Sequence, residues 1–271
     1  MRLLLAELAP RPADAPSNAR RIGEVLASAT CDVAVFPELF LSGYRIGDRF
    51  HQVALHPSDS MMTTLSEIAR VRRTPFVVGA PMQSSARAGE IHNAAVLFRP
   101  DGTVAQQTKR FLPTYGPFEE GSLFTATRES HPVELASQRV GLQICYDAFF
   151  PEVSRDLALE GAELLLIISS APVTSRKLFE KVLPARAVEN ACPVVYVNRV
   201  GVEDGVVFGG GSGSWDARGE PLKGETVPLT GASQEEHVWL VDIDLKDAAR
   251  WRPFRPVLRD IASHRLRGGD P

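Results

Sequence analysis

Short apolar runs alternate along the chain with segments in which apolar residues recur at helical spacing. The runs of strand length cover residues 2–7, 32–36, 76–80, 139–144, 163–168, 194–198 and 237–243. The segments with helical spacing cover residues 18–29, 57–72, 151–160 and 176–190. We expect Ser17 to cap the first of these helices and Pro184 to kink or restart the last.

A β-hairpin is predicted in the first half of the chain. Residues 93–98 and 103–108 both read as strands, and Asp101-Gly102 between them supplies the tight turn. Strands that alternate with helices, with a hairpin between them, indicate an α/β protein with a mixed sheet or two sheets and the helices outside. We expect a single domain over residues 1–271, with an irregular Arg- and Pro-rich tail from about residue 245 that wraps the domain or a partner subunit.

Composition excludes several classes of protein. The chain has 271 residues, of which 44% are hydrophobic, and a net charge of -3 with scattered basic residues. These values disfavour disorder, nucleic-acid binding and electrostatic membrane binding. The apolar run 164–168 is far too short to cross a bilayer, and the N-terminus lacks the pattern of a signal peptide. Three cysteines are too few for a disulfide framework, so we expect a reducing, cytoplasmic location.

Motifs for nucleotide or metal chemistry are missing from the sequence. The Gly-rich stretch 209–214 lacks the third glycine of a dinucleotide fingerprint and the spacing of a serine nucleophile elbow. The six histidines never pair at the spacing of metal ligands. We therefore expect neither a metal nor a nucleotide cofactor.

Three polar residues lie at the end of an apolar strand or just after it, and together they suggest a catalytic site. They are Glu38, Lys109 and Cys145. Because sites gather at the carboxyl ends of strands in α/β sheets, these side chains can converge. Taken singly, each has a structural explanation, and we interpret Cys31 and Cys192 as core cysteines.

The residues around these three positions resemble the motifs of the nitrilase (carbon–nitrogen hydrolase) superfamily. Residues 36–44 (FPELFLSGY) are similar to its first Glu motif, and Lys109 with 115–120 (YGPFEE) looks like its Lys motif. Residues 145–152 (CYDAFFPE) look like its nucleophile motif. Segments 185–190 and 197–201 also match, and the resemblance runs from the first strand to about residue 244.

The resemblance implies a four-layer α–β–β–α sandwich and a Glu-Lys-Cys triad. Carried over by position, Glu38 is the general base, Lys109 the lysine and Cys145 the nucleophile. A second family Glu lies shortly after the lysine, and we choose Glu120 over Glu119 because residues 120–124 fit the family register better. The resemblance also implies a homodimer that packs through helices near the nucleophile, or a higher homo-oligomer.

The triad predicts covalent, cofactor-free hydrolysis. A free thiol has a pKa of about 8.5, and we expect the nearby ammonium of Lys109 to favour the thiolate of Cys145. Glu38 would accept the thiol proton, deliver a proton to the leaving amine and then activate water to hydrolyse a thioester. Lys109 and the backbone N–H of Tyr146 would stabilise the oxyanion.

The substrate is predicted from the three residues that follow the nucleophile motif's Asp. Family members that bind substrate carboxylates often place Arg there, whereas this chain has Ala-Phe-Phe at 148–150. Phe149 would then form an apolar wall or pack in the core, and a small neutral or apolar amide fits best. An aliphatic nitrilase, an ω-amidase or N-carbamoyl hydrolase, and a stand-alone glutaminase subunit are the alternatives.

Three other functions were considered from the sequence. A chain of this length leaves no room for the ATP-using domain of a glutamine-dependent NAD synthetase. A scaffold protein that has lost turnover is disfavoured because all three triad positions are filled. Acyl transfer to an acceptor other than water shares the first half-reaction, so the sequence does not separate it from hydrolysis.

Overall fold

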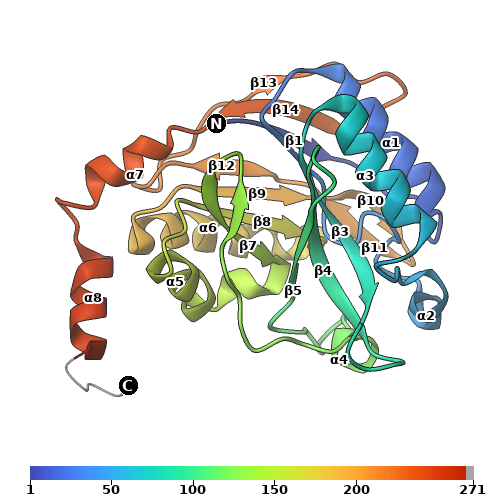
Figure 1. Cartoon of the computed structure of the whole chain (residues 1–271), viewed down its shortest axis with the longest axis horizontal. Helices are drawn as coiled ribbons and strands as arrows, with labels where there is room; N and C mark the ends of the chain where they lie inside the picture. The colour runs from blue at the N-terminus through green and yellow to red at the C-terminus, as the bar shows by residue number, and fades with distance from the viewer. Residues whose placement is uncertain (267–271) are drawn as a thin grey trace.

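The computed structural model describes residues 1–266, which form two sheets between two layers of helices (Figure 1). The seven-stranded sheet has the order β13 (Glu225–Thr226), β14 (His237–Asp242), β1 (Arg2–Glu7), β2 (Val33–Val35), β3 (Phe76–Gln83), β4 (Ile91–Phe98) and β5 (Val104–Thr108). The five-stranded sheet has the order β12 (Gly213–Trp215), β9 (Val194–Asn198), β8 (Leu164–Ser169), β7 (Gln138–Ile144) and β6 (Val133–Leu135). A separate hairpin consists of β10 (Val200–Glu203) and β11 (Val206–Gly209).

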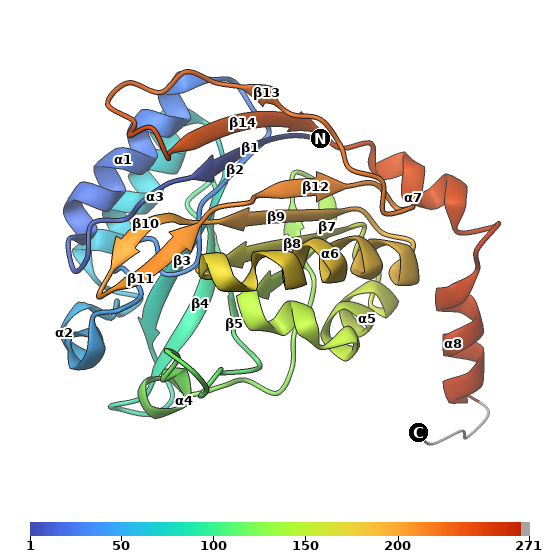
Figure 2. The ribbon, with the colours of Figure 1, turned by 180° about the vertical axis from the view of Figure 1, so that it is seen from behind.

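Helices cover the outer face of each sheet. Figure 2 shows α1 (Ala15–Ser28) and α3 (Ser60–Arg72) on the first sheet and α5 (Pro151–Leu159) and α6 (Arg176–Asn190) on the second. The shorter helices are α2 (Phe50–Val53), α4 (Glu120–Leu123), α7 (Leu245–Trp251), α8 (Val257–Leu266) and the 3₁₀ turns η1 (Gly47–Arg49), η2 (Cys145–Phe149) and η3 (Val173–Ser175). The four layers confirm the predicted α–β–β–α sandwich.

Strand alternation builds the core between the sheets. On β1, Leu3 and Leu5 belong to the core shared with β7 and β8, whereas Leu4 and Ala6 belong to the core under α1 and α3. Because successive side chains of a strand point to opposite faces, one short strand serves both layers. The first sheet is therefore buried on both faces, which explains its continuous apolar runs.

The predicted elements are present with shifted ends. The hairpin pairs Phe98 with Val104 around the Asp101-Gly102 turn, as predicted. The first helix begins at Ala15 and not at Asn18, because Asp14 is its cap and accepts the N–H of Ser17 at 3.0 Å.

Pro184 lies inside α6 and does not restart the helix, which was one of the two outcomes we expected. The helix runs unbroken from Arg176 to Asn190. Proline removes one backbone hydrogen bond, but Phe179, Leu183 and Ala187 are buried against the second sheet and α5 and hold the helix together.

Two stretches were predicted wrongly. The chain from Leu245 onward is not irregular within the described residues: α7 starts at a capping Asp244, whose side chain accepts the N–H of Lys246 at 3.0 Å, and α8 follows. Between residues 198 and 237 we predicted no strand and noted only the Gly-rich stretch at 209–214, but this part of the chain forms β10 to β13. These strands have two to four residues, too few for an alternating pattern to stand out.

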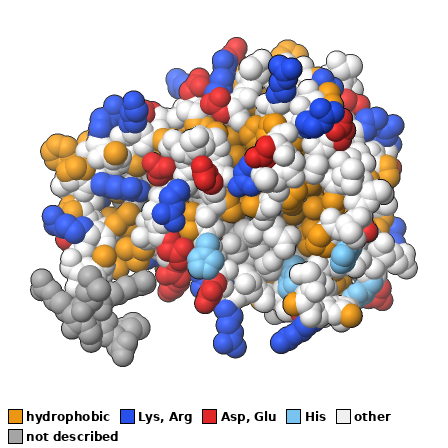
Figure 3. All heavy atoms as spheres, viewed as in Figure 1, with side chains coloured by type: hydrophobic (Ala, Val, Ile, Leu, Met, Phe, Trp, Pro, Cys, Tyr) orange, Lys and Arg blue, Asp and Glu red, His pale blue; other side chains and the backbone are white. Residues whose placement is uncertain are grey.

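The surface shows mixed charge. On the face in Figure 3, Lys and Arg side chains are interspersed with Asp and Glu. Among the described residues, no helix has the length and apolar character needed to cross a membrane.

Candidate active site

Three strand ends place the predicted residues at one edge of the sandwich. Glu38 follows β2, Lys109 follows β5 directly, and Cys145 follows β7 directly. Both β2 and β7 pair in parallel with a neighbour in their own sheet, and functional residues gather at the carboxyl ends of such strands. Side chains from separate sheets therefore meet in one buried place.

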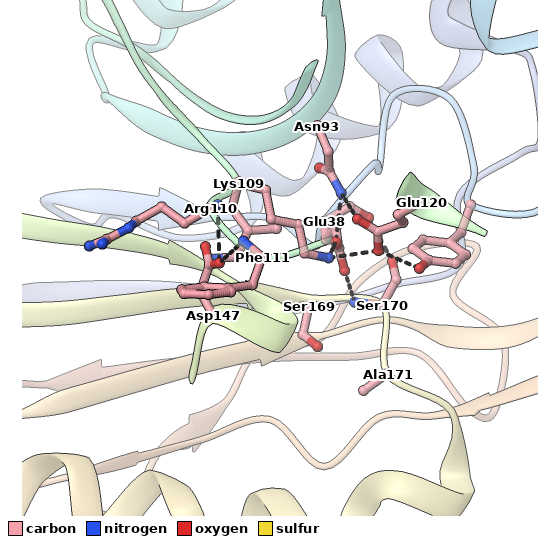
Figure 4. A network of polar contacts seen from close by, with 12 residues as sticks. Glu38, Asn93, Lys109, Arg110, Phe111, Glu120, Asp147, Ser169, Ser170 and Ala171 are labelled. Atoms are coloured by element: carbon pink, nitrogen blue, oxygen red, sulfur yellow. Dashed lines mark hydrogen bonds and ion pairs between the residues drawn. The ribbon is translucent and has the colours of Figure 1, made fainter. Parts of the chain in front are cut away.

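A buried ammonium between two carboxylates forms the centre of the site (Figure 4). Lys109 Nζ lies 2.6 Å from Glu38 Oε1 and 2.7 Å from Glu120 Oε1. Lys109 and Glu38 have no exposed surface, and Glu120 is 2% exposed. Glu119, the other candidate for the second Glu, is exposed and lies outside this cluster.

Several neighbours fix the carboxylates, and sequence reasoning did not find them. Asn93 Nδ2 donates to Glu38 Oε1 at 2.8 Å and to Glu120 Oε2 at 3.2 Å. The backbone N–H of Ser170 donates to Glu38 Oε2 at 2.7 Å, and the Tyr44 hydroxyl donates to Glu120 Oε1. Asn93 could have been noticed as a polar residue inside an apolar strand, and Tyr44 as part of the first Glu motif.

A glycine on β3 makes room for the backbone of Glu38. A Cβ at Gly79 would lie 2.2 Å from the backbone N of Leu39 and 2.4 Å from the Cα of Glu38. Only glycine permits this approach. Leu39 itself has a φ of +49°, so the chain turns sharply just after the carboxylate.

Cys145 begins the turn η2 in a conformation that L-residues rarely adopt. Its φ is +48°, and its side chain is 7% exposed. The Ser169 hydroxyl forms a hydrogen bond with the thiol and accepts one from Tyr196 Oη at 3.0 Å. Strained backbone of this kind clusters at functional sites.

The charges of the cluster decide its protonation states. Burial alone would lower the pKa of Lys109, but the carboxylates of Glu120 and Glu38 outweigh burial and raise it. Burial raises the pKa of Glu120, and the positive charge of Lys109 opposes that shift. The lysine therefore stays an ammonium.

The thiol differs from our expectation. Burial and the charge of Glu38 raise the pKa of Cys145, and the charge of Lys109 lowers it by less. Lys109 acts in the predicted direction, but two carboxylates already neutralise it, so a thiolate would add a second net negative charge. Cys145 therefore rests as a thiol, and it would need a base in order to act as a nucleophile.

The aromatic residues after Cys145 pack on one another. The ring of Phe149 lies edge-on to Phe179 with centroids 4.9 Å apart, and Phe179 stacks on Tyr196 at 4.9 Å. Tyr146 contacts Tyr115 at 5.4 Å, and both Tyr146 and Phe149 are half-buried. Phe149 thus belongs to an aromatic column that reaches the thiol through Ser169 and Tyr196.

A small cavity reaches the cluster. It has a volume of about 100 Å³, and its walls include Glu120, Tyr44, Phe50 and Phe124. Larger hollows of about 350 and 650 Å³ lie elsewhere, beside α1 and beside residues 242–246, and contain none of the clustered residues. In the described part of the chain, no group of three or more His, Cys, Asp or Glu side chains could hold a metal ion.

The sandwich and the Glu–Lys–Glu cluster beside a cysteine define a class of hydrolase, and sequence comparison gives its family. Residues 5–253 match the carbon–nitrogen hydrolase family, and the chain belongs to it. It is therefore an enzyme of the nitrilase superfamily that hydrolyses carbon–nitrogen bonds.

Amidases are among its relatives. The chain is 35% identical to the (R)-stereoselective amidase of a Pseudomonas species, over 92% of this chain and 88% of that protein. It is 33% identical to the 2-oxoglutaramate amidase of Paenarthrobacter nicotinovorans, over 84% and 78% of the two chains.

A solved structure shows the same likeness. The amidase from Nesterenkonia sp. AN1 superposes with a TM-score of 0.80 and 30% identity, over 98% of this chain and 99% of that one. In a mutant of that amidase, the acetamide moiety of fluoroacetamide is covalently attached to the active-site cysteine.

Proposed function

We propose that the protein is a cysteine-dependent amidase that converts a small neutral or apolar amide to a carboxylic acid and ammonia. The observation that carries the proposal is the buried ammonium of Lys109 held by Glu38 and Glu120 beside Cys145. The amidase relatives and the adduct on the cysteine of the Nesterenkonia enzyme support it.

The first half-reaction forms a thioester. Cys145 Sγ attacks the amide carbonyl carbon while Glu38 accepts the thiol proton, which suits a nucleophile that rests as a thiol. The carbonyl oxygen becomes an oxyanion, and the Lys109 ammonium and the backbone N–H of Tyr146 stabilise it. Glu38 then gives the proton to the amine, the C–N bond breaks and ammonia leaves.

The second half-reaction releases the acid. Glu38 accepts a proton from water, whose oxygen attacks the thioester carbon, and the same donors stabilise the second oxyanion. The C–S bond breaks, and the proton returns to Cys145. Glu120 holds Lys109 throughout and orients the substrate, and Glu38 ends in its starting state.

Charge and packing favour a neutral substrate. Among the ion pairs of the described residues, Lys109 is the cation that contacts Glu38 and Glu120. These two carboxylates already balance its charge. Arg186 on α6, one of the arginines close to the turn η2, donates to the carbonyl of Ala148 at 2.7 Å. With Phe149 in the aromatic column, the described residues around this turn offer no clamp for a substrate carboxylate.

Ammonia release from a panel of compounds tests the proposal. The panel contains short aliphatic and aromatic amides, glutamine and ω-amides, N-carbamoyl amino acids and aliphatic nitriles, with Cys145→Ala as the control. We expect release from neutral amides that is lost in Cys145→Ala. Release only from carboxylate-bearing compounds would contradict the neutral-substrate proposal and leave the triad intact, whereas release that persists in Cys145→Ala would overturn the nucleophile.

We also propose a homodimer in a reducing, cytoplasmic compartment. Support for the dimer comes from the outer layer of α5 and α6 near the nucleophile, where Leu178 is 53% exposed. Support for the compartment comes from three cysteines that are all free. Light scattering after size-exclusion chromatography tests the dimer, and a monomeric mass would contradict it.

A further inference from the structure

Asp147 is a buried carboxylate that the proposed chemistry does not use. It is 1% exposed and lies two residues after Cys145 in the turn η2. Its Oδ1 accepts the backbone N–H groups of Arg110 at 3.1 Å and Phe111 at 2.9 Å, and its Oδ2 accepts that of Ile144 at 3.2 Å. Figure 4 shows the bonds from the segment that follows β5.

These N–H groups flank the two groups that act on the substrate. Arg110 directly follows Lys109, and Ile144 directly precedes Cys145. The bond from Ile144 to Asp147 spans the cysteine, whose left-handed φ of +48° persists only if its surroundings hold it there. One carboxylate thus ties the lysine segment of one sheet to the nucleophile turn of the other.

Other contacts hold the same turn without titrating near neutral pH. The rings of Phe111 and Phe150 stack with centroids 3.6 Å apart and an interplanar angle of 6°. From α6, Arg186 Nε donates to the carbonyl of Ala148 at 2.7 Å. Asp147 is the contact in this group whose charge changes with pH.

The charged groups around Asp147 are few. Burial raises the pKa of its carboxyl to about 7, while the charge of Lys109 and the backbone N–H donors act in the opposite direction. The side chain of Arg110 is turned to Asp156 on α5 at 3.2 Å, and Arg186 faces carbonyl groups. Within the described residues, Asp147 forms no ion pair, so backbone dipoles and the more distant Lys109 balance its charge.

We propose that Asp147 is a positioning residue that holds Lys109 and Cys145 in register, and that protonation of its carboxylate releases the nucleophile turn. The ionised carboxylate accepts all three N–H groups, whereas protonation of Oδ2 makes that oxygen a donor and a weaker acceptor toward the N–H of Ile144. The rate of attack by Cys145 then depends on the charge of a residue that never touches the substrate. The activity readout rests on the proposed amidase function, whereas alkylation of the thiol does not.

The experiment compares wild type with Asp147→Asn and with the matched control Asp156→Asn. Asp156 also binds Arg110, but through the side chain and not the backbone. Two rates are measured between about pH 5 and pH 9: hydrolysis of the best amide of the panel, and alkylation of Cys145 by iodoacetamide, read by peptide mass. If no amide is turned over, the amidase proposal fails while the alkylation profile still decides this one.

We expect both wild-type rates to rise through a midpoint near neutrality. In Asp147→Asn, kcat at pH 8 falls at least about tenfold with little change in KM, and the near-neutral step disappears from both profiles. Asp156→Asn follows wild type. A variant Asp147→Asn that keeps the wild-type rate and the step would overturn the proposal, because the step would then belong to another group.

A measurement on the wild-type protein covers the case in which the variant does not fold. With ¹³C-labelled aspartate carboxyls, nuclear magnetic resonance follows each aspartate across the same pH range. We expect one carboxyl resonance to titrate near neutrality. If no aspartate titrates there, the switch does not exist, whatever the variants do.

Discussion

At the scale of single residues, Lys109 is held as an ammonium by the carboxylates that it joins. It lies 2.6 Å from Glu38 and 2.7 Å from Glu120, with no exposed surface. The three side chains together carry one net negative charge, and Asn93 and Tyr44 donate hydrogen bonds to that charge. Removing the ammonium would leave two carboxylates in one buried site, and one of them would take up a proton.

Replacing Lys109 with methionine therefore removes more than one function. We expect Lys109→Met to lose the oxyanion donor and the positive charge that holds Glu38 and Glu120 together. The expected loss in kcat/KM is about a thousandfold or more, equivalent to roughly 4 kcal/mol. The exposed Lys177→Met is the matched control and should retain wild-type kinetics. A loss below about tenfold in Lys109→Met would show that the oxyanion is stabilised elsewhere.

Single residues of the site differ in how far the sequence predicts them. The sequence predicts the residues that follow apolar strands, Glu38, Lys109 and Cys145, because functional residues gather at the ends of such strands in α/β folds. Asn93 binds Glu38 across 55 sequence positions, and its contact depends on the exact pairing of β3 with β4. The raised pKa of Cys145 depends on burial and net charge, which only the folded arrangement determines.

At the scale of elements, the turn η2 combines a strained cysteine with a buried carboxylate. Burial raises the pKa of Asp147 from an ordinary value of 3.8 to about 7. Between these two pH values the folded protein keeps a proton on Asp147 that the unfolded chain has released, and this proton stabilises the folded state. The stabilisation is complete below about pH 4 and is lost as the pH rises through 7. The charge that we propose to position the site thus costs stability.

This linkage predicts a pH-dependent difference in stability. The free energy of unfolding of wild type should fall relative to that of Asp147→Asn, by on the order of 2–3 kcal/mol between about pH 5 and pH 8. Asparagine does not titrate, so subtracting the free energy of unfolding of Asp147→Asn from that of wild type cancels the contributions of all other groups. Urea unfolding at both pH values measures the difference. A constant difference would mean that the carboxyl of Asp147 titrates at its ordinary value.

Strand β3 and the segment after β2 make a second element-scale prediction through Gly79. A Cβ at this position would lie 2.2 Å from the backbone N of Leu39, so one of the two backbone segments would have to shift. We expect Gly79→Ala to displace Glu38 and to reduce kcat/KM at least about a hundredfold. Gly23→Ala on α1 is the control, because no atom lies within 4 Å of its Cβ and a helical Gly→Ala change stabilises by about 0.5–1 kcal/mol. Full activity in Gly79→Ala would show that the segment relaxes without moving the carboxylate.

The sequence predicts a strand or helix reliably where its pattern of apolar residues extends over enough positions. The hairpin β4–β5 combines two apolar strands with Asp101-Gly102, and both signals agree. Asp204-Gly205 between β10 and β11 is the same turn signal, but its strands have four residues each and the surrounding glycines hide the alternation. Helices α7 and α8 were missed because Arg and Pro dominate that stretch, although Asp244 is an ordinary cap.

At the scale of the whole molecule, the sandwich separates the three cysteines into different surroundings. Cys31 is partly exposed, and burial with the charge of Asp32 raises its pKa to about 11. Cys192 is fully buried, and burial raises its pKa to about 12. Cys145 also has a raised pKa, yet it alone among the three lies beside the Glu38 carboxylate, whose charge contributes to that shift.

We expect iodoacetamide to label Cys145 before Cys31 and Cys192, for a reason other than a stable thiolate. The reagent is itself a small amide, and Glu38 removes the thiol proton as the sulfur attacks. Labelling at neutral pH, read by peptide mass, should therefore be slowed at Cys145 in Glu38→Gln and unchanged at Cys31. In denaturant the three thiols should react alike because burial and the nearby base are both lost. Preferential labelling of Cys31 in the native protein would contradict a base-assisted nucleophile at Cys145, and fast labelling of Cys145 in Glu38→Gln would mean that the thiolate forms without that base.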